Sequence, residues 1–331
     1  MTNAFTQLIG IDLPIVQAAM GGATSPALAA AVSNAGGLGM LALGWSSSDE
    51  VRAEIRATKS LASKPFGVNL VLTQHQEERL SIALSEGVKV ISFFWEIADS
   101  RLIEAAHAGG AVVLQTVASA EQARIAVNNG ADVVVAQGWE AGGHIRGTVT
   151  TLALIPAVVD VVGATPVIAA GGIADGRGLA AALTLGATGA WIGTRFLAAS
   201  EAAINSHYRD LIFAACETDT EYSVLFDVSW PDAPHRTLRN STFNSWEMAG
   251  RPVTGSRPKE GQVIGRSPNG DIFRYQDLTP GSSTEGDIEA MSLWCGQGVA
   301  LVRKVQSAAQ IVKEIADEAR ATFKRLGAVQ F

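Results

Sequence analysis

A single histidine stands in a glycine-rich stretch, QGWEAGGHIRG, which runs from Gln137 to Gly147. His144 follows a Gly-Gly pair directly, and imidazole is the side chain whose unperturbed pKa lies nearest to physiological pH. A neutral imidazole at the mouth of an active site can take a proton from a carbon acid. No Cys or second His stands beside it, which argues against a metal site. The stretch therefore predicts His144 as a general base.

The other histidines lie in different contexts. His75, His107 and His235 are flanked by polar residues and are expected to be solvated, and His207 lies in NSHYRD, a polar helix start. A GxSxG serine elbow is absent from the sequence. His144 is thus the one histidine that we expect at a strand end with glycines beside it.

Two further glycine-bearing loops lie near the ends of predicted strands. AAGGIADGRG contains Gly171 and Gly172, and GAWIGTR contains Gly193 and Thr194. In a barrel, the loops after the seventh and eighth strands often hold a phosphate on backbone N–H groups. Either loop alone is adequately explained as a turn, but the occurrence of both at the expected places predicts a phosphate site.

The kind of phosphate ligand follows from motifs that are absent. No GxxxxGK[ST] loop occurs, and no GxGxxG follows the first predicted strand, so neither a P-loop nor a dinucleotide fingerprint is present. A barrel that holds one phosphate beside apolar strand ends suits flavin mononucleotide (FMN). Asn69 and Gln137 are amides at strand ends that can donate to and accept from the flavin ring, and each is equally compatible with a bond to a loop backbone.

Short apolar runs recur through the first two thirds of the chain, and helix-like segments separate them. Most runs are nearly continuous in Val, Ile, Leu and Ala, which is typical of parallel strands covered on both faces. Eight βα units predict an α/β fold, a closed (β/α)8 TIM barrel with its active site at the C-terminal ends of the strands; a doubly wound sheet is the alternative. The runs are PIVQAA (14–19), LGMLAL (38–43), FGVNLVL (66–72), VKVISFFW (88–95), AVVLQTV (111–117), DVVVAQG (132–138), PVIAAGG (166–172) and GAWIGTRFL (189–197).

Helix boundaries and the later part of the chain can also be predicted. Ser25 and Ser119 are expected as N-caps, and Gly36 as a C-terminal stop. The stretch 228–286 is rich in Pro, Gly, Ser, Arg and Trp and predicts an irregular excursion above the barrel, while 302–326 predicts a closing helix. We therefore expect a barrel from 1–205 and 290–331, with a smaller substrate-capping segment at 206–289.

Composition excludes several classes of partner. The formal net charge is -7 and no Lys/Arg-rich run occurs, so nucleic acid is not expected as a partner. The two cysteines have no metal or redox spacing, which fits a reducing cytoplasm. No signal peptide or membrane span is evident. The apolar Trp-bearing surface of 228–286 is compatible with either a lid or an interface of a homo-oligomer.

The motifs QGWEAGGHIRG, PVIAAGGIADGRGLAAALTLGA and GAWIGTRFLAASE resemble those of the nitronate monooxygenases, formerly called 2-nitropropane dioxygenases. PIVQAAMGG and PFGVNL are similar to the same family nearer the N-terminus, and the resemblance covers most of residues 10–202. It implies an FMN-binding TIM barrel with a smaller domain over its mouth. It also implies oxidation of nitronates or nitroalkanes by O2 to a carbonyl compound and nitrite.

The resemblance also implies roles for particular residues. His144 matches the catalytic base of the class that oxidises nitroalkanes, and propionate 3-nitronate is the substrate that the resemblance suggests most readily. The positions that match flavin contacts are Met20, Asn69, Gln137, Gly142, Gly172, Trp191, Ile192, Gly193 and Thr194.

One departure from the family pattern leaves an alternative open. Ile145 stands between GGH and Arg-Gly, and this feature is similar to the flavin-type enoyl-acyl-carrier-protein reductases, which take hydride from NAD(P)H. Quinone reductases of the same superfamily are a further alternative. A flavin-free binding protein on a barrel would instead be colourless and indifferent to a change at His144.

Overall fold

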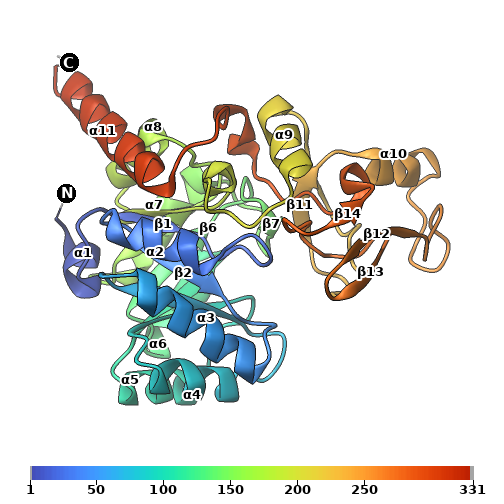
Figure 1. Cartoon of the computed structure of the whole chain (residues 1–331). Coiled ribbons are helices and arrows are strands. Elements are labelled where there is room, and N and C mark those ends of the chain that lie inside the picture. The colour runs from blue at the N-terminus through green and yellow to red at the C-terminus, as the bar shows by residue number, and fades with distance from the viewer. Residues whose placement is uncertain (1, 329–331) are drawn as a thin grey trace.

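The computed structural model describes residues 2–328, and its centre is a closed barrel of parallel strands (Figure 1). All eight apolar runs form barrel strands, so the predicted TIM barrel is confirmed and the open sheet is excluded. β8 and β9 are the seventh and eighth strands of the barrel, because the label β7 belongs to a short strand outside it. The barrel strands are β1 (Ile15–Gln17), β2 (Leu38–Ala42), β3 (Phe66–Val71), β4 (Val90–Phe94), β5 (Val112–Val117), β6 (Val133–Gln137), β8 (Val167–Ala170) and β9 (Gly189–Ile192).

Helices surround the barrel, and their starts are determined by local capping. Ser25 and Ser119 each accept a backbone N–H as N-caps, as predicted, and Gly36 follows the first barrel helix with a φ of 98°. After β9 the chain leaves the barrel, and α11 returns to pack against α8 and α2. The surrounding helices are α2 (Pro26–Asn34), α3 (Ser48–Leu61), α4 (Glu77–Ser85), α5 (Ser100–Ala108), α6 (Ala120–Asn128), α7 (Thr151–Val162), α8 (Gly176–Thr184) and α11 (Ala308–Leu326), and α1 (Ala4–Ile9) precedes β1.

The closing helix begins later than predicted. α11 starts at Ala308 rather than near 302, because Ser307 and Gln310 form a capping box there. The preceding residues belong to the short 3-10 helix η3 (Gln297–Leu301) and to a loop.

The segment predicted to be irregular contains regular structure, and Figure 1 shows much of it gathered on one side of the barrel. One three-stranded sheet has the order β10-β11-β7 and the other β13-β12-β14. Phe226, Phe243 and Tyr275 are buried in a small aromatic core of the segment 206–289. The remaining elements are β7 (Gly143–His144), η1 (Thr194–Ala198), α9 (Ser206–Ala214), β10 (Thr220–Ser223), β11 (His235–Leu238), α10 (Ser241–Met248), β12 (Val263–Ser267), β13 (Gly270–Phe273), β14 (Glu285–Gly286) and η2 (Ile288–Ala290).

The barrel has an apolar interior and an apolar outer layer, as alternating side chains of parallel strands require. Val133 and Val135 of β6 point inward with Met40, whereas Val134 and Ala136 point outward toward the helices. The residues that end the inward-facing rows therefore lie at the mouth of the barrel. These rows position the candidate site.

Gly39 provides a test of the contact between β2 and α2. A Cβ atom at this position would lie 2.0 Å from the backbone oxygen of Ala29, which cannot move without displacing the helix. We expect Gly39→Ala to lower the free energy of unfolding by about 3 kcal/mol, measured by urea denaturation. Gly21→Ala, where the added Cβ meets nothing within 4 Å, is the control and should leave the midpoint almost unchanged. Equal midpoints for both variants would contradict this packing.

Candidate active site

His144 lies on a short strand that the capping segment holds in place. β7 pairs antiparallel with β11, with His144 opposite His235 and Gly143 opposite Arg236. The N–H of Ile145 donates to the carbonyl of Pro234 at 2.8 Å, and the Ile145 side chain is fully buried. Ile145, the residue that departs from the family pattern, thus anchors the strand. His144 is consequently fixed by a partner strand, although its flanking glycines suggested a bendable loop.

Hydrogen bonds also hold the loop that carries His144 against the barrel. The Glu140 carboxylate accepts bonds from the N–H and the hydroxyl of Thr151, at 2.8 and 2.9 Å, at the start of α7. The Gln137 side-chain amide donates to the carbonyl of His144 at 3.2 Å. The loop between β6 and α7 is therefore tied to the barrel on both sides of His144.

Aromatic side chains surround the His144 ring. The ring centroid of Trp230 lies 4.1 Å away, and those of Trp294, His235 and Trp95 lie 5.2, 5.6 and 6.0 Å away. We call Trp95, Trp230 and Trp294 the aromatic enclosure. The Nε2 atom of His144 is buried and has no hydrogen-bond partner among residues 2–328. A buried polar atom without a partner in its own chain points to a group supplied by a ligand.

Burial keeps His144 neutral. It lowers the pKa of His144 to about 3, and the nearby His235 lowers it further in the same direction. A neutral imidazole can accept a proton, whereas an imidazolium cannot. The enclosure therefore maintains the protonation state that a general base needs.

The expectation that His235 is solvated was wrong. His235 is fully buried, and burial lowers its pKa to about 4. Its Nδ1–H donates to the carbonyl of Ala233 at 2.9 Å, and its Nε2 accepts the N–H of Phe226 at 3.2 Å. These bonds require the neutral ring. Polar neighbours suggested exposure because sequence periodicity does not show that β11 is paired on both edges.

The two predicted amides lie on inward-facing rows at the mouth. Val68 and Leu70 flank Asn69 and point outward to the helices, so Asn69 faces the interior, and Gln137 follows the inward-facing Val135 by two residues. The Asn69 side chain is largely buried, with 7% of its surface exposed. Its amide therefore faces the barrel mouth rather than bulk solvent.

The other residues that were matched to flavin contacts reach the barrel mouth either through their side chains or through their backbone. Trp191 packs in the barrel interior, and a Cβ at Gly193 would lie 3.9 Å from the sulfur of Met20, which brings the ends of β1 and β9 together. Ile192 points outward into the helical layer, so only its backbone is directed to the mouth. Among residues 2–328, the backbone N–H groups of Gly172, Gly193 and Thr194 take part in none of the backbone hydrogen bonds that lie outside helices and strands. This is the donor set that a phosphate requires.

The stretch WCGQG (294–298), to which the sequence analysis assigned no role, packs behind these loops. A Cβ on Gly142 would lie 2.3 Å from the carbonyl carbon of Cys295, and one on Gly298 would lie 2.8 Å from the oxygen of Gly172. The hydroxyl of Thr194 accepts the N–H of Gly296 at 2.9 Å. Gly142 and the Thr194 side chain therefore have structural partners within the chain. The glycines of WCGQG were the available signal, because closely packed backbones need them.

Gln115, Arg146 and Trp139 lie near the barrel mouth, and each contacts another part of the chain. Gln115 is fully buried, and its side chain bonds to the N–H of Ala98 at 3.0 Å and to the carbonyl of Glu96 at 3.1 Å. Arg146 lies over the Trp95 ring at 5.5 Å and pairs with Glu96 at 2.9 Å. Trp139 packs against Arg236 at 4.5 Å. Gln115 thus fixes the loop that carries Trp95.

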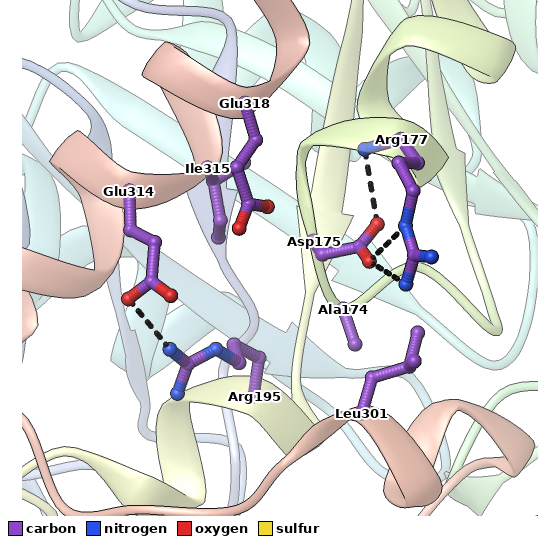
Figure 2. A pocket seen from close by; sticks show the side chains of 8 residues that line it. All are labelled: Ala174, Asp175, Arg177, Arg195, Leu301, Glu314, Ile315 and Glu318. Atoms are coloured by element: carbon purple, nitrogen blue, oxygen red, sulfur yellow. Dashed lines mark hydrogen bonds and ion pairs between the residues drawn. The ribbon is translucent and has the colours of Figure 1, made fainter. Parts of the chain in front are cut away.

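A separate pocket, whose lining side chains are drawn in Figure 2, lies between α8, α11 and the two 3-10 helices η1 and η3. Its volume is about 190 Å³. Arg195 in it pairs with Glu314 at 3.3 Å, and Asp175 caps α8 through the N–H groups of Arg177 and Gly178. Its charged groups bond mainly to one another and not to His144. The lining residues are Ala174, Asp175, Arg177, Arg195, Leu301, Glu314, Ile315 and Glu318.

Residues 2–328 contain neither a cluster of candidate metal ligands nor a membrane-spanning helix. No group of three or more His, Cys, Asp or Glu side chains in this range is placed to hold a metal ion. Within the same range, every helix is too short or too polar to cross a bilayer.

The lowered pKa values of His144 and His235 predict how stability depends on pH. The unfolded chain protonates both imidazoles below about pH 6.5, while the folded chain keeps them neutral down to about pH 3 to 4. The free energy of unfolding therefore falls as the pH is lowered through this window. We expect His144→Gln and His235→Gln each to reduce this slope by about 1.4 kcal/mol per pH unit, measured by urea denaturation between pH 6 and about 4.5. His75→Gln, at an exposed position, is the control; equal slopes in all variants would contradict neutral buried rings.

Comparison with known proteins identifies the family. The family model described as nitronate monooxygenase matches residues 2–79 and 73–318. The (3aS,4S,5R,7aS)-5-hydroxy-7a-methyl-1-oxo-octahydro-1H-indene-4-carboxyl-CoA dehydrogenase of Rhodococcus jostii is 33% identical over 359 residues, which cover 100% of this chain and 99% of the relative. The nitronate monooxygenase of Pseudomonas aeruginosa is 33% identical, with 97% and 100% covered.

A solved structure of FabK from Thermotoga maritima superposes with a TM-score of 0.83 at 33% identity, and the match covers 99% of this chain and 100% of that one. The relatives thus include proteins named for different reactions on one barrel. Because the family model matches nearly the whole chain, and relatives above 30% identity span it, this chain belongs to the nitronate monooxygenase family of flavin-dependent oxidoreductases.

Proposed function

We propose that this protein is an FMN-dependent nitronate monooxygenase, which oxidises nitronates and nitroalkanes with O2 to a carbonyl compound and nitrite. The observation that carries the proposal is His144, a neutral imidazole with a buried Nε2 that has no partner among residues 2–328. The family relation agrees with this reaction. His144 is the proposed base.

The proton transfer follows from the surroundings of His144. A neutral nitroalkane bound against Nε2 loses the proton on the carbon that carries the nitro group, and the products are an imidazolium and a nitronate anion. The enclosure excludes water, so the two opposite charges attract each other strongly and the anion raises the pKa of His144 as it forms. A substrate supplied as the nitronate has already lost this proton and does not need the base.

The residues at the mouth fit a bound FMN. Asn69 and Gln137 are the amides proposed for the polar edge of the flavin ring, and the N–H groups of Gly172, Gly193 and Thr194 are proposed for its phosphate. Met20, Trp191 and the backbone at Gly142 and Ile192 complete the proposed contacts. FMN supplies the electron acceptor for the oxidation when it is bound.

The alternative is an FMN-dependent reductase that uses NAD(P)H, of the enoyl-acyl-carrier-protein reductase or quinone reductase type. Ile145 favours it, because this residue departs from the nitronate monooxygenase pattern, and so does the similarity to FabK. In that reaction, the neutral His144 would first have to gain a proton from solvent before it could protonate the substrate. The two functions differ in the source of electrons.

The reaction is tested with purified protein under air, without NAD(P)H. We expect oxygen uptake and nitrite release with both nitroethane and its nitronate. His144→Asn should lower kcat/KM for neutral nitroethane by at least a hundredfold, because the base is lost, and should change that for the nitronate much less. His75→Asn, at an exposed position, is the control and should behave as wild type. Absence of turnover, together with bleaching of the flavin by NADH or NADPH, would favour the reductase.

The cofactor is tested by its release. Denatured protein should release FMN rather than FAD, as identified by mass, because the site offers donors for one phosphate. Asn69→Ala should weaken FMN binding about fivefold to tenfold through loss of one hydrogen bond, measured by titration of the stripped protein. Asn128→Ala, on an exposed helix end, is the matched control. Release of FAD, or equal affinity of both variants, would contradict the proposed contacts.

A further inference from the structure

Trp95 is held in a conformation that tryptophan rarely adopts. It follows β4 directly at the barrel mouth and has a φ of 86°, in the left-handed region that is unfavourable for a bulky side chain. Arg146 donates to its carbonyl, and Gln115 holds the carbonyl of the next residue, Glu96, at 3.1 Å. Such conformations occur where a site depends on them. Here the conformation directs the indole toward His144.

The enclosure continues into a larger apolar surface. The ring of Trp95 lies 4.6 Å from that of Trp230, and Trp45 extends the contact at 5.5 Å from Trp230. Val71 packs against Trp230 in the same cluster, and Phe94 lies beside it. Trp45 is 53% exposed, so this apolar surface runs from solvent to His144. Each large member is aromatic or aliphatic, which suits an apolar group.

The charges around the enclosure do not favour a second anionic group on a nitronate substrate. The guanidinium of Arg146, which lies over the Trp95 ring, is already paired with Glu96 at 2.9 Å. The neighbouring His235 is neutral because both of its ring nitrogens are engaged. The cation that lies over an indole of the enclosure is thus already paired. A carboxylate on the substituent of a nitronate would lose its hydration here without gaining a cation as a partner.

We propose that this site selects nitronates that carry an apolar alkyl or aryl group over those that carry a second negative charge, and that Trp95 and Trp230 determine this specificity. The inference rests on the proposed function. It differs from the expectation of propionate 3-nitronate, which the family resemblance suggested. The nitronate group lies against His144, and its substituent packs against the surface that the two contacting indoles form.

A chain-length series tests the inference. We expect kcat/KM for the nitronates of nitroethane to nitropentane to rise about fourfold per added methylene, and propionate 3-nitronate to react at least tenfold more slowly than 1-nitrobutane nitronate of similar length. Trp95→Gly is the informative variant, because glycine accepts the positive φ without strain while the indole is lost. We expect Trp95→Gly to reduce the gain in kcat/KM per added methylene to below twofold. Trp246→Leu removes an indole of the capping segment outside the enclosure and should keep the wild-type increment.

A binding measurement separates this inference from the proposed function. Straight-chain monocarboxylates imitate the planar nitronate group and need no turnover, and their binding is measured by the change in the flavin absorption spectrum. We expect hexanoate to bind at least tenfold more tightly than adipate, the dicarboxylate of equal length, and Trp95→Gly to remove most of this preference. Turnover of nitronates without a chain-length effect would overturn the inference alone. Absence of nitronate turnover would overturn the proposed function, and the carboxylate series would still decide the inference: an equal affinity for hexanoate and adipate would reject it.

Discussion

The pairing of β7 with β11 is the constraint on which the candidate site depends. It joins the loop after β6, which carries His144, to a strand nearly a hundred residues later, and it places His235 opposite His144. Without this pairing, the glycines on the N-terminal side of His144 would leave the ring free to face solvent. The capping segment 206–289 is thus part of the candidate site, since it supplies Trp230 as well as the partner strand.

Desolvation then links structure to chemistry. The same aromatic rings that fix the His144 ring also remove water from it, so the ring stays neutral. As the proposed base, His144 needs no carboxylate partner, because a bound substrate supplies the opposite charge during the proposed reaction. The cost of the buried, unpartnered Nε2 is offset only when a ligand is present.

The sequence predicted the barrel well, because its strands are continuous apolar runs and its helices begin with Ser caps. It predicted less of the site. His235 looked solvated, yet it is buried, because pairing across β11 depends on contacts distant in sequence. Gly142 was matched to flavin, and its lack of a side chain is also required by the backbone of Cys295, a contact that no local pattern reveals. The left-handed Trp95 was likewise invisible, since its conformation is imposed by Arg146 and by the loop that Gln115 holds.

The most direct test of this account is the protonation state of His144 itself. Selective ¹⁵N labelling of histidine, with His144→Asn used to assign the signal, would give the pKa of its imidazole in the holoenzyme without substrate. The account predicts a neutral ring from pH 8 down to about pH 5, because burial lowers its pKa well below the usual value. A protonation midpoint near pH 6.5 would show that the ring is solvated and would contradict the role assigned to the aromatic enclosure.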